Sequence, residues 1–445
     1  MSGALPRGSA ILAHGVGNRE DLPLPFPLAV GGAATVLVLS FVALAVLWPQ
    51  PRIDGAHAGR AVPSSVAALL DSRATRALLA LTGTLASAYV LAALLFGKDD
   101  ANNPVPFVVF VLFWVGLVPV SVLLGPLWRR LNPLRALHGA LLVAARLDPR
   151  TGVLALPARL GYWPAALGLL AFTWLELVAP GSTTLPVLRV AITLYAGTQL
   201  LAALLFGSRW FDHGDAFEVW SGLFGRLSVL GRRTDGRIVV RSPLAGLDAL
   251  RPAPGLPATV AVMLGTTAYD GASGALWWFG FVQSSSVPVL LQTLGLLAVV
   301  AVVALSFAGA SALAARVAGA DPRLMPGAFA PSLVPIALGY VIAHYWSLLV
   351  LEGQNAFIHL SDPLGTGADL LGLGSRAADP TLLAPGLVAS VQVAAIVAGH
   401  VLGVVLAHDK AVRMFPRRRA VAGQLPLLAL MVAYTCGGLF LLFSS

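Results

Sequence analysis

Ionisable side chains interrupt several apolar runs of this sequence, and three of them have types suited to acid–base or metal chemistry. Asp270 lies in "GTTAYDGASGALWWFG", and His344 and Glu352 lie in "GYVIAHYWSLLVLEGQNAFIHL". Carboxylate oxygen and neutral imidazole nitrogen bind zinc and copper, and the same groups transfer protons. Asp270, His344 and Glu352 are therefore the predicted catalytic residues, and a divalent metal, zinc or copper, is the predicted cofactor.

Two further histidines extend this set, so the predicted metal ligands are His344, Asp270, His359 and His14. His14 follows small residues in "AILAHG", in the manner of a signal-peptidase site. Cleavage there would make His14 the amino terminus, where the free amine and the imidazole can chelate a metal together. The alternative is a flexible N-terminal segment. The sequence contains no HExxH or HxH motif, no GxSxG elbow and no phosphate-binding loop, which argues against serine-hydrolase and ATP-driven mechanisms.

Four other ionisable residues lie in or beside apolar runs. Glu176 and Arg189 flank a short turn and are predicted to form an ion pair. His408, followed by Asp409 and Lys410, is predicted to anchor its helix at the membrane interface. His400 is either a core histidine or a ligand or proton relay.

Composition indicates the elements that must position these groups, because 57% of the residues are hydrophobic and only 11% are charged. A helix of about 20 apolar residues crosses the hydrocarbon core of a membrane. Ten runs of this kind predict an all-α, polytopic transmembrane helical bundle. They are 26–48, 76–97, 105–127, 160–179, 185–207, 256–278, 287–314, 328–351, 385–407 and 424–443.

The net charge of +9 is distributed unevenly, with 24 of the 29 Lys and Arg residues in alternate loops. By the positive-inside rule these loops are cytoplasmic and both termini are extracytoplasmic. The basic balance is thus explained by orientation in a bacterial plasma membrane, and nucleic acid is not an expected partner. The expected partners are the lipid bilayer and a small lipophilic molecule or ion. The single cysteine, Cys436, excludes a disulfide framework.

The domain organisation predicted from these runs is simple. Residues 1–24 form an extracytoplasmic segment, and 25–445 form one transmembrane domain with a cytoplasmic amphipathic loop at 208–255 and an extracytoplasmic lid loop at 352–384. Apolar residues at three- and four-residue spacing in "WFDHGDAFEVWSGLFGRLSVLGRR" predict a helix lying on the inner leaflet. Acidic residues at its start favour a helix N-terminus, with a metal or proton role as the alternative. Residues 131–147 predict a second interfacial helix from which Arg135 can snorkel.

The predicted depths allow Asp270 and His344 to meet. Asp270 lies about eight residues from the outer end of its helix, marked by Trp277 and Trp278, which is a depth of roughly 12 Å. His344 lies at a depth of roughly 10 Å by the same estimate. Three interpretations remain open for the resulting pocket: a metal site, a proton-transfer site, or hydrogen bonding between helices with Tyr340 and Tyr345 as partners.

Long stretches of the chain resemble a family of bacterial multi-pass membrane proteins that carries the name fenitrothion hydrolase. The resembling stretches include "AHGVGNREDLPLP", "NPVPFVVFVLFWVGLVPVSVLLGPLWRRLNPLRALHG", "LVPIALGYVIAHYWSLLVLEGQ" and "VAGHVLGVVLAHDKA". The resemblance implies breakdown of organophosphate triesters. Combined with the pocket, it predicts that a metal held by His344, Asp270 and a residue of the lid loop activates water to attack a lipophilic triester at phosphorus. The alternative function is a transporter or permease subunit for protons, metal ions or small solutes, because ionisable residues occur at several depths.

Overall fold

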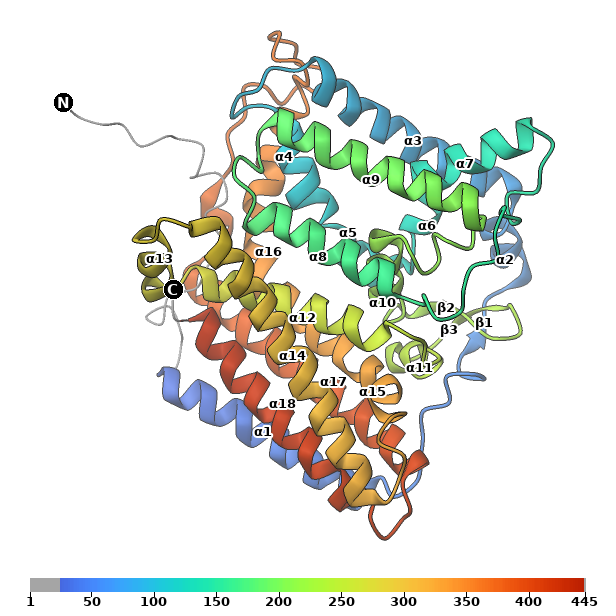
Figure 1. Cartoon of the computed structure of the whole chain (residues 1–445), viewed down its shortest axis with the longest axis vertical. Coiled ribbons are helices and arrows are strands. Elements are labelled where there is room, and N and C mark those ends of the chain that lie inside the picture. Colours follow the sequence, from blue (N-terminus) through green and yellow to red (C-terminus); the bar gives the residue numbers. More distant parts are fainter. Residues whose placement is uncertain (1–24, 444–445) are drawn as a thin grey trace.

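The computed structural model describes residues 25–443 and is built mainly from helices that run side by side (Figure 1). Eight helical segments in this range are long and apolar enough to cross a membrane. They are α1 (Phe26–Leu47), α3 (Arg73–Phe96), the segment Pro104–Leu124, α9 (Leu185–Phe206), α14 (Pro288–Ala318), the segment Met325–His359, α17 (Pro385–Met414) and α18 (Ala420–Leu442). The prediction of an all-α bundle of membrane-spanning helices is confirmed, with eight such segments among residues 25–443 in place of ten.

The two other predicted spans form shorter helices. Residues 160–179 contain α8 (Trp163–Leu177), and 256–278 contain α12 (Leu256–Ser273) followed by a separate short helix, α13 (Leu276–Gln283). Most of α12 is buried among other helices, so it meets protein rather than lipid on most of its surface. A helix in such a position does not need the uniformly apolar sequence of a lipid-facing span.

Two of the long segments are broken into pieces of different helical type. In the first, the N–H of Trp114 bonds to the carbonyl of Val109, five residues earlier, at 3.1 Å, which is a π-helical bond. Prolines and glycines break the regular ladder in both segments, and neighbouring helices accommodate such breaks. The pieces are α4 (Pro104–Phe107), the π-helix η3 (Val108–Phe113) and α5 (Leu117–Leu124), and then α15 (Met325–Phe329), the 3-10 helix η4 (Ala330–Leu333) and α16 (Val334–His359).

The predicted inner-leaflet helix is instead buried inside the bundle. This helix, α10 (Ala216–Gly225), begins at Asp215, whose side chain accepts hydrogen bonds from the N–H groups of Phe217 and Glu218. It packs against α5 and α8. Trp220 is 1% exposed and even Glu218 is only 6% exposed. The amphipathic pattern identified an apolar face correctly, but it does not distinguish lipid from protein as the partner of that face.

A small antiparallel sheet, which the sequence did not predict, lies at one end of the bundle (Figure 1). Its order is β1-β3-β2, with Arg60 opposite Val240 and Leu230 also opposite Val240. We call this end, where α9 ends and α12 begins, the sheet end, and the opposite end the loop end. The elements here are β1 (Arg60–Ala61), α2 (Ser64–Leu70), α6 (Trp128–Leu131), α7 (Pro133–Ala144), β2 (Leu230–Arg232), β3 (Ile238–Val240) and α11 (Pro243–Asp248).

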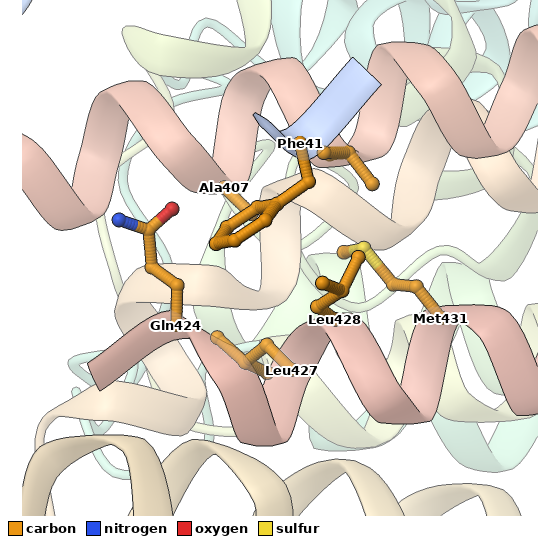
Figure 2. Close-up of a pocket in the computed structure, with 7 residues that line it drawn as sticks. Phe41, Ala407, Gln424, Leu427, Leu428 and Met431 are labelled. Atoms are coloured by element: carbon orange, nitrogen blue, oxygen red, sulfur yellow. The ribbon is translucent and has the colours of Figure 1, made fainter. Parts of the chain in front are cut away.

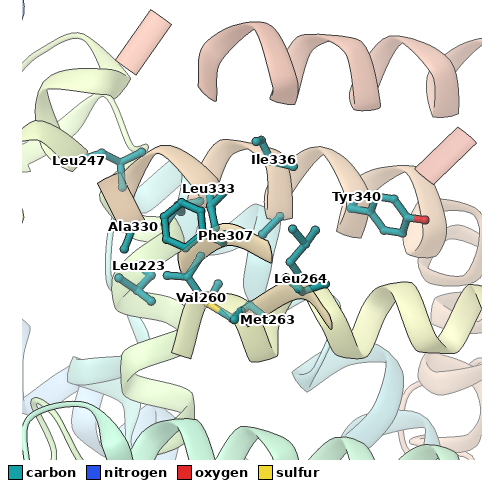
Figure 3. Packing of buried hydrophobic residues seen from close by; sticks show 14 of the residues in the cluster. Leu223, Leu247, Val260, Met263, Leu264, Phe307, Ala330, Leu333, Ile336 and Tyr340 are labelled. Atoms are coloured by element: carbon teal, nitrogen blue, oxygen red, sulfur yellow. The ribbon is translucent and has the colours of Figure 1, made fainter. Parts of the chain in front are cut away.

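The main hydrophobic core lies where α12, α14, η4 and α16 meet (Figure 3). Phe307, Leu333 and Ile336 are each 1% exposed and pack with residues of α12. Gly265 permits close contact here, because a Cβ at this position would lie 2.8 Å from Cα of Val300 in α14. This packing fixes the position of α12 and therefore of the residues at its C-terminal end.

The predicted lid loop is shorter than expected. Helix α16 continues to His359, so the irregular segment begins near Leu360, and it contains the 3-10 turn η5 (Pro380–Leu382). The carbonyl of Leu360 accepts a hydrogen bond from Tyr89 in α3 at 2.5 Å. Leu370 and Leu371 are more than half exposed. These two leucines therefore lie at the surface, and the start of the segment contacts α3.

Candidate functional site

Three helices bring the candidate site together at the loop-end half of the bundle. Asp270 lies in the last turn of α12, three residues before its end, because Gly274 and the start of α13 terminate the helix there. His344 and Tyr345 are neighbours on α16, and Glu176 lies in the last turn of α8. The predicted meeting of Asp270 and His344 is confirmed, although Asp270 is nearer to the end of its helix than expected.

One oxygen of Asp270 is the centre of the site. His344 Nε2 lies 3.0 Å from Asp270 Oδ2, and the hydroxyl of Tyr345 donates to the same oxygen at 2.6 Å. The rings of His344 and Tyr345 meet edge to face, with centroids 4.6 Å apart. All three side chains are at most 5% exposed. A carboxylate bonded to Nε2 fixes the orientation of the imidazole ring, as in hydrolases that use a histidine as a base.

A cavity of about 190 Å³ adjoins this group. Pockets for drug-sized ligands measure roughly 300–1,000 Å³, and a water molecule takes about 30 Å³ of liquid volume. The cavity therefore has room for a small chemical group and a few waters. Its walls come from the ends of α8 and α12 and from α16, and they are formed by Glu176, Leu177, Asp270, Gly271, Ser273, Gly274 and His344.

Glu352 and His359, two further predicted site residues, lie away from this cavity. Both are on α16, eight and fifteen residues after His344, which places them roughly 12 and 22 Å along the helix axis. Glu352 accepts a hydrogen bond from Asn355, and the ring of His359 packs on Phe107 at 4.8 Å. The sequence places them in a loop beside His344 because the apolar run ends at residue 351, whereas α16 continues to His359. His14 lies outside the described residues.

Two of the predicted metal ligands, Asp270 and His344, are in contact with each other. They could offer a metal ion oxygen and nitrogen ligand atoms. Within residues 25–443 no group of three or more His, Cys, Asp or Glu side chains is arranged to hold a metal ion. Zinc and copper sites in proteins use three or four ligands. The Asp270–His344 pair thus supplies part of such a ligand set.

The predicted ion pair between Glu176 and Arg189 is replaced by two separate arrangements. Arg189 donates to the carbonyls of Leu94 and Leu95 in the last turn of α3, at 2.8 and 3.3 Å. A cation at a helix C-terminus is stabilised by the exposed carbonyls there. Glu176 instead lines the cavity beside Asp270. This adds a second carboxylate to the site.

The two histidines of α17 have different surroundings. His408 Nδ1 lies 2.9 Å from the side-chain oxygen of Gln424, and its Nε2 lies 3.0 Å from the carbonyl oxygen of Trp48. It therefore ties α17 to α1 and α18 near the sheet end. His400 is 1% exposed, and its Nδ1 lies 2.8 Å from the Ile396 carbonyl. Its Nε2 has no hydrogen-bond partner among the described residues.

A second buried polar cluster surrounds the start of α10. Glu218 forms an ion pair with Arg135 of α7 at 2.7 Å, and Arg135 also bonds to Asp212 at 2.7 Å. The hydroxyl of Tyr195 donates to Asp215 at 2.8 Å. The sequence located the acidic residues but not their partners, and Arg135 pairs inside the protein rather than snorkelling. The signal available in the sequence was that acidic residues in 208–255 could pair with basic residues in 131–147.

A second cavity is a narrow apolar crevice between α1, α17 and α18 (Figure 2). Phe41, Ala407 and Met431 are among its walls, and Gln424 lies at one edge. Its volume of about 10 Å³ is at most that of one water molecule. It does not compete with the Asp270 cavity as a ligand site.

These features define a multi-pass helical membrane protein with a buried Asp–His–Tyr group beside a small cavity. Comparison of the chain with protein-family models, with curated proteins and with solved structures finds no match. The functional argument therefore depends on the geometry of the site.

Proposed function

We propose that the protein lies in a bacterial plasma membrane with its sheet end in the cytoplasm and both termini outside. The basic loops support this orientation, because the segments 208–255 and 408–423 carry twelve of the Lys and Arg residues and belong to the sheet end. The exposed residues of α13 also support it. Trp277 is 72% exposed and Phe279 57% exposed at the opposite end, as expected for side chains in the outer membrane interface. The Asp270 cavity then faces outward.

The function that this site supports best is hydrolysis of a small lipophilic ester, with phosphotriesters as the substrate class that the sequence resemblance implies. The observation that carries this proposal is the 3.0 Å contact between His344 Nε2 and Asp270 Oδ2 in the wall of a cavity large enough for water. A neutral ester of this type partitions into membranes. The cavity would admit the reacting phosphoryl group and a water molecule, while the rest of the ester stays outside it.

In this mechanism Asp270 holds the imidazole of His344 so that the ring can accept a proton from water. The water oxygen attacks phosphorus, the bond from phosphorus to the leaving oxygen breaks, and the leaving group departs as an alkoxide or phenolate. Tyr345 keeps Asp270 in place through its hydrogen bond. A divalent metal such as zinc or copper, held in part by Asp270 and His344, would supply a more acidic water.

Hydrolysis of a chromogenic p-nitrophenyl phosphotriester by the purified protein tests this proposal. His344→Ala and Asp270→Asn should each lower kcat/KM by about 10²-fold or more, because a positioned general base contributes roughly that much. His57→Ala is the matched control, since His57 is 80% exposed at the sheet end. Elemental analysis of the same samples reports zinc and copper per chain. Full activity in His344→Ala would refute the hydrolytic site.

Proton-coupled transport is the second candidate, because the protein has buried acidic clusters on both sides of an aromatic group. Trp114 stacks on Trp220 at 4.1 Å, and Phe172 and Phe217 pack beside them. Phe172 lies one turn before Glu176 at the outer cavity, and Phe217 lies two residues after Asp215 in the inner cluster. Broken helices of the kind found here occur at transporter sites.

Flux measurements in proteoliposomes distinguish the two functions. A hydrolase should turn over the ester without moving protons across the membrane, and its activity should depend on His344 but not on Glu218. A transporter should show proton or solute flux that both His344→Ala and Glu218→Gln abolish, with no ester turnover. Glu352→Gln provides the control, because Glu352 contacts neither cluster.

A further inference from the structure

Arg241, directly after β3 at the sheet end, is a buried guanidinium without an acidic partner. The residue is 7% exposed, and its Nε and Nη1 atoms make no hydrogen bond within residues 25–443. Its backbone N–H is bonded to the Val229 carbonyl at 2.8 Å, so the strand holds the residue in place. Buried polar atoms are nearly always hydrogen-bonded, and an unpaired buried charge is costly.

Two glycines make the space in which this guanidinium lies. A Cβ at Gly231 of β2 would lie 2.3 Å from Arg241 Cζ, and a Cβ at Gly246 of α11 would lie 2.7 Å from Arg241 Nη2. Any larger residue at either position would displace the side chain. The guanidinium of Arg241, which follows β3, therefore lies between Gly231 of β2 and Gly246 of α11.

Neighbouring arginines differ from Arg241 because they have carboxylate partners. Arg232 pairs with Asp71 at 2.5 Å, and Arg413 pairs with Asp248 at 3.0 Å. Arg226, at the end of α10, is the exception. Its side chain forms no hydrogen bond or ion pair among residues 25–443. The same added Cβ at Gly246 that would lie 2.7 Å from Arg241 Nη2 would lie 1.9 Å from the Arg226 carbonyl oxygen, so the two residues are neighbours. The charge of Arg226 also contributes, after burial, to lowering the pKa of Arg241. Two neighbouring cations thus share a buried region to which no carboxylate is bonded.

We propose that Arg241 and Arg226 form a binding site for a phosphate group at the sheet end. A guanidinium presents parallel N–H donors that match two phosphate oxygens. A phosphate dianion would offset both positive charges, and the monoanionic phosphodiester of a lipid headgroup would offset one of them. Arg226 is half-buried, so part of its side chain is accessible from the surface. The phosphate belongs either to the headgroup of an anionic phospholipid in the adjacent leaflet or to a soluble phosphate compound. This site is independent of the Asp270 cavity.

Thermal unfolding of the full chain, delipidated in a neutral detergent, tests the proposal with phosphatidylglycerol, phosphatidylcholine and inorganic phosphate as separate additions. Phosphatidylglycerol should raise the Tm of the unmodified protein, and the concentration needed should rise at least tenfold in Arg241→Gln and in Arg226→Gln. Arg237→Gln is the matched control, because Arg237 lies in the same hairpin with a 70% exposed side chain.

The additions separate the two sources of phosphate. Protection by phosphatidylglycerol alone assigns the site to a lipid headgroup, and equal protection by inorganic phosphate assigns it to a soluble compound. Arg226→Gln carries the test if Arg241→Gln does not fold, because Arg226 is less buried. The proposal is overturned if neither phosphatidylglycerol nor inorganic phosphate raises the Tm of the unmodified protein. It is also overturned if the arginine variants respond as Arg237→Gln does.

Discussion

At the scale of single residues, the site depends on two donors that share one oxygen of Asp270. Tyr345 forms the shorter contact, at 2.6 Å, and the acceptor is a buried carboxylate. Hydrogen bonds to a charged group contribute more than neutral ones, because the desolvated charge depends on them. Tyr345 therefore acts on the chemistry of His344 through Asp270, as a positioning residue.

Replacing Tyr345 by Phe should lower the free energy of unfolding by about 1.5–3 kcal/mol, the usual range for a bond to a charged group. Tyr340→Phe is the matched control on the same helix, since the Tyr340 hydroxyl donates to a neutral carbonyl, that of Gly438, at 3.2 Å. It should cost about 0.5–1.5 kcal/mol. Chemical denaturation in a mild detergent measures both. Equal losses would mean that Tyr345 does not stabilise a carboxylate.

At the scale of elements, α16 and α17 approach each other through a pair of glycines, and this crossing supports the helix that carries His344. A Cβ at Gly339 would lie 2.4 Å from the Ala395 carbonyl oxygen, and one at Gly399 would lie 2.6 Å from that of Pro335. Small residues at helix crossings let backbones come close in membrane proteins. No flexible side chain is available to move aside at either point.

Gly339→Ala should therefore destabilise the protein by about 1–3 kcal/mol, the usual cost of overpacking. Gly353→Ala on the same helix should be neutral or slightly stabilising, because nothing lies within 4 Å of its added Cβ and Ala is the better helix former. Unfolding temperatures of the two variants provide the comparison. A larger loss for Gly353→Ala would show that the α16–α17 crossing is not close-packed.

The segment after α16 should respond to pH through Asp362. Backbone N–H groups of Thr366 and Gly367 bond to its carboxylate and lower its pKa. A lowered pKa means that the stabilisation is complete above about pH 4, the ordinary range for Asp, and is lost as the pH falls through the lowered value. Hydrogen exchange in 361–384 should be slow at pH 6 relative to the intrinsic rate and should lose protection as the pH falls below about 4. Asp362→Asn should lack that protection at pH 6.

At the scale of the whole molecule, the sequence predicted the long membrane-spanning helices but missed most contacts between segments far apart in the chain. Long apolar runs predicted α1, α9 and α17 to within a few residues at their starts, since spanning length and hydropathy are local properties. The meeting of Asp270 with His344 followed from matching depths. The burial of α10 did not, because its pairing of Glu218 with Arg135 joins segments 83 residues apart. The grouping of Glu352 with His344 failed for a different reason, an error in where α16 ends.

The orientation of the molecule in the membrane can be determined by labelling single cysteines from one side. In a Cys436→Ala background, Ser65→Cys places a thiol on the exposed surface of α2 at the sheet end, and Ser375→Cys places one in the exposed segment at the loop end. A membrane-impermeant maleimide applied to intact cells should label Ser375→Cys and should label Ser65→Cys only after the membrane is permeabilised. The reversed pattern would place the Asp270 cavity toward the cytoplasm, and the substrate would then have to reach it from inside the cell.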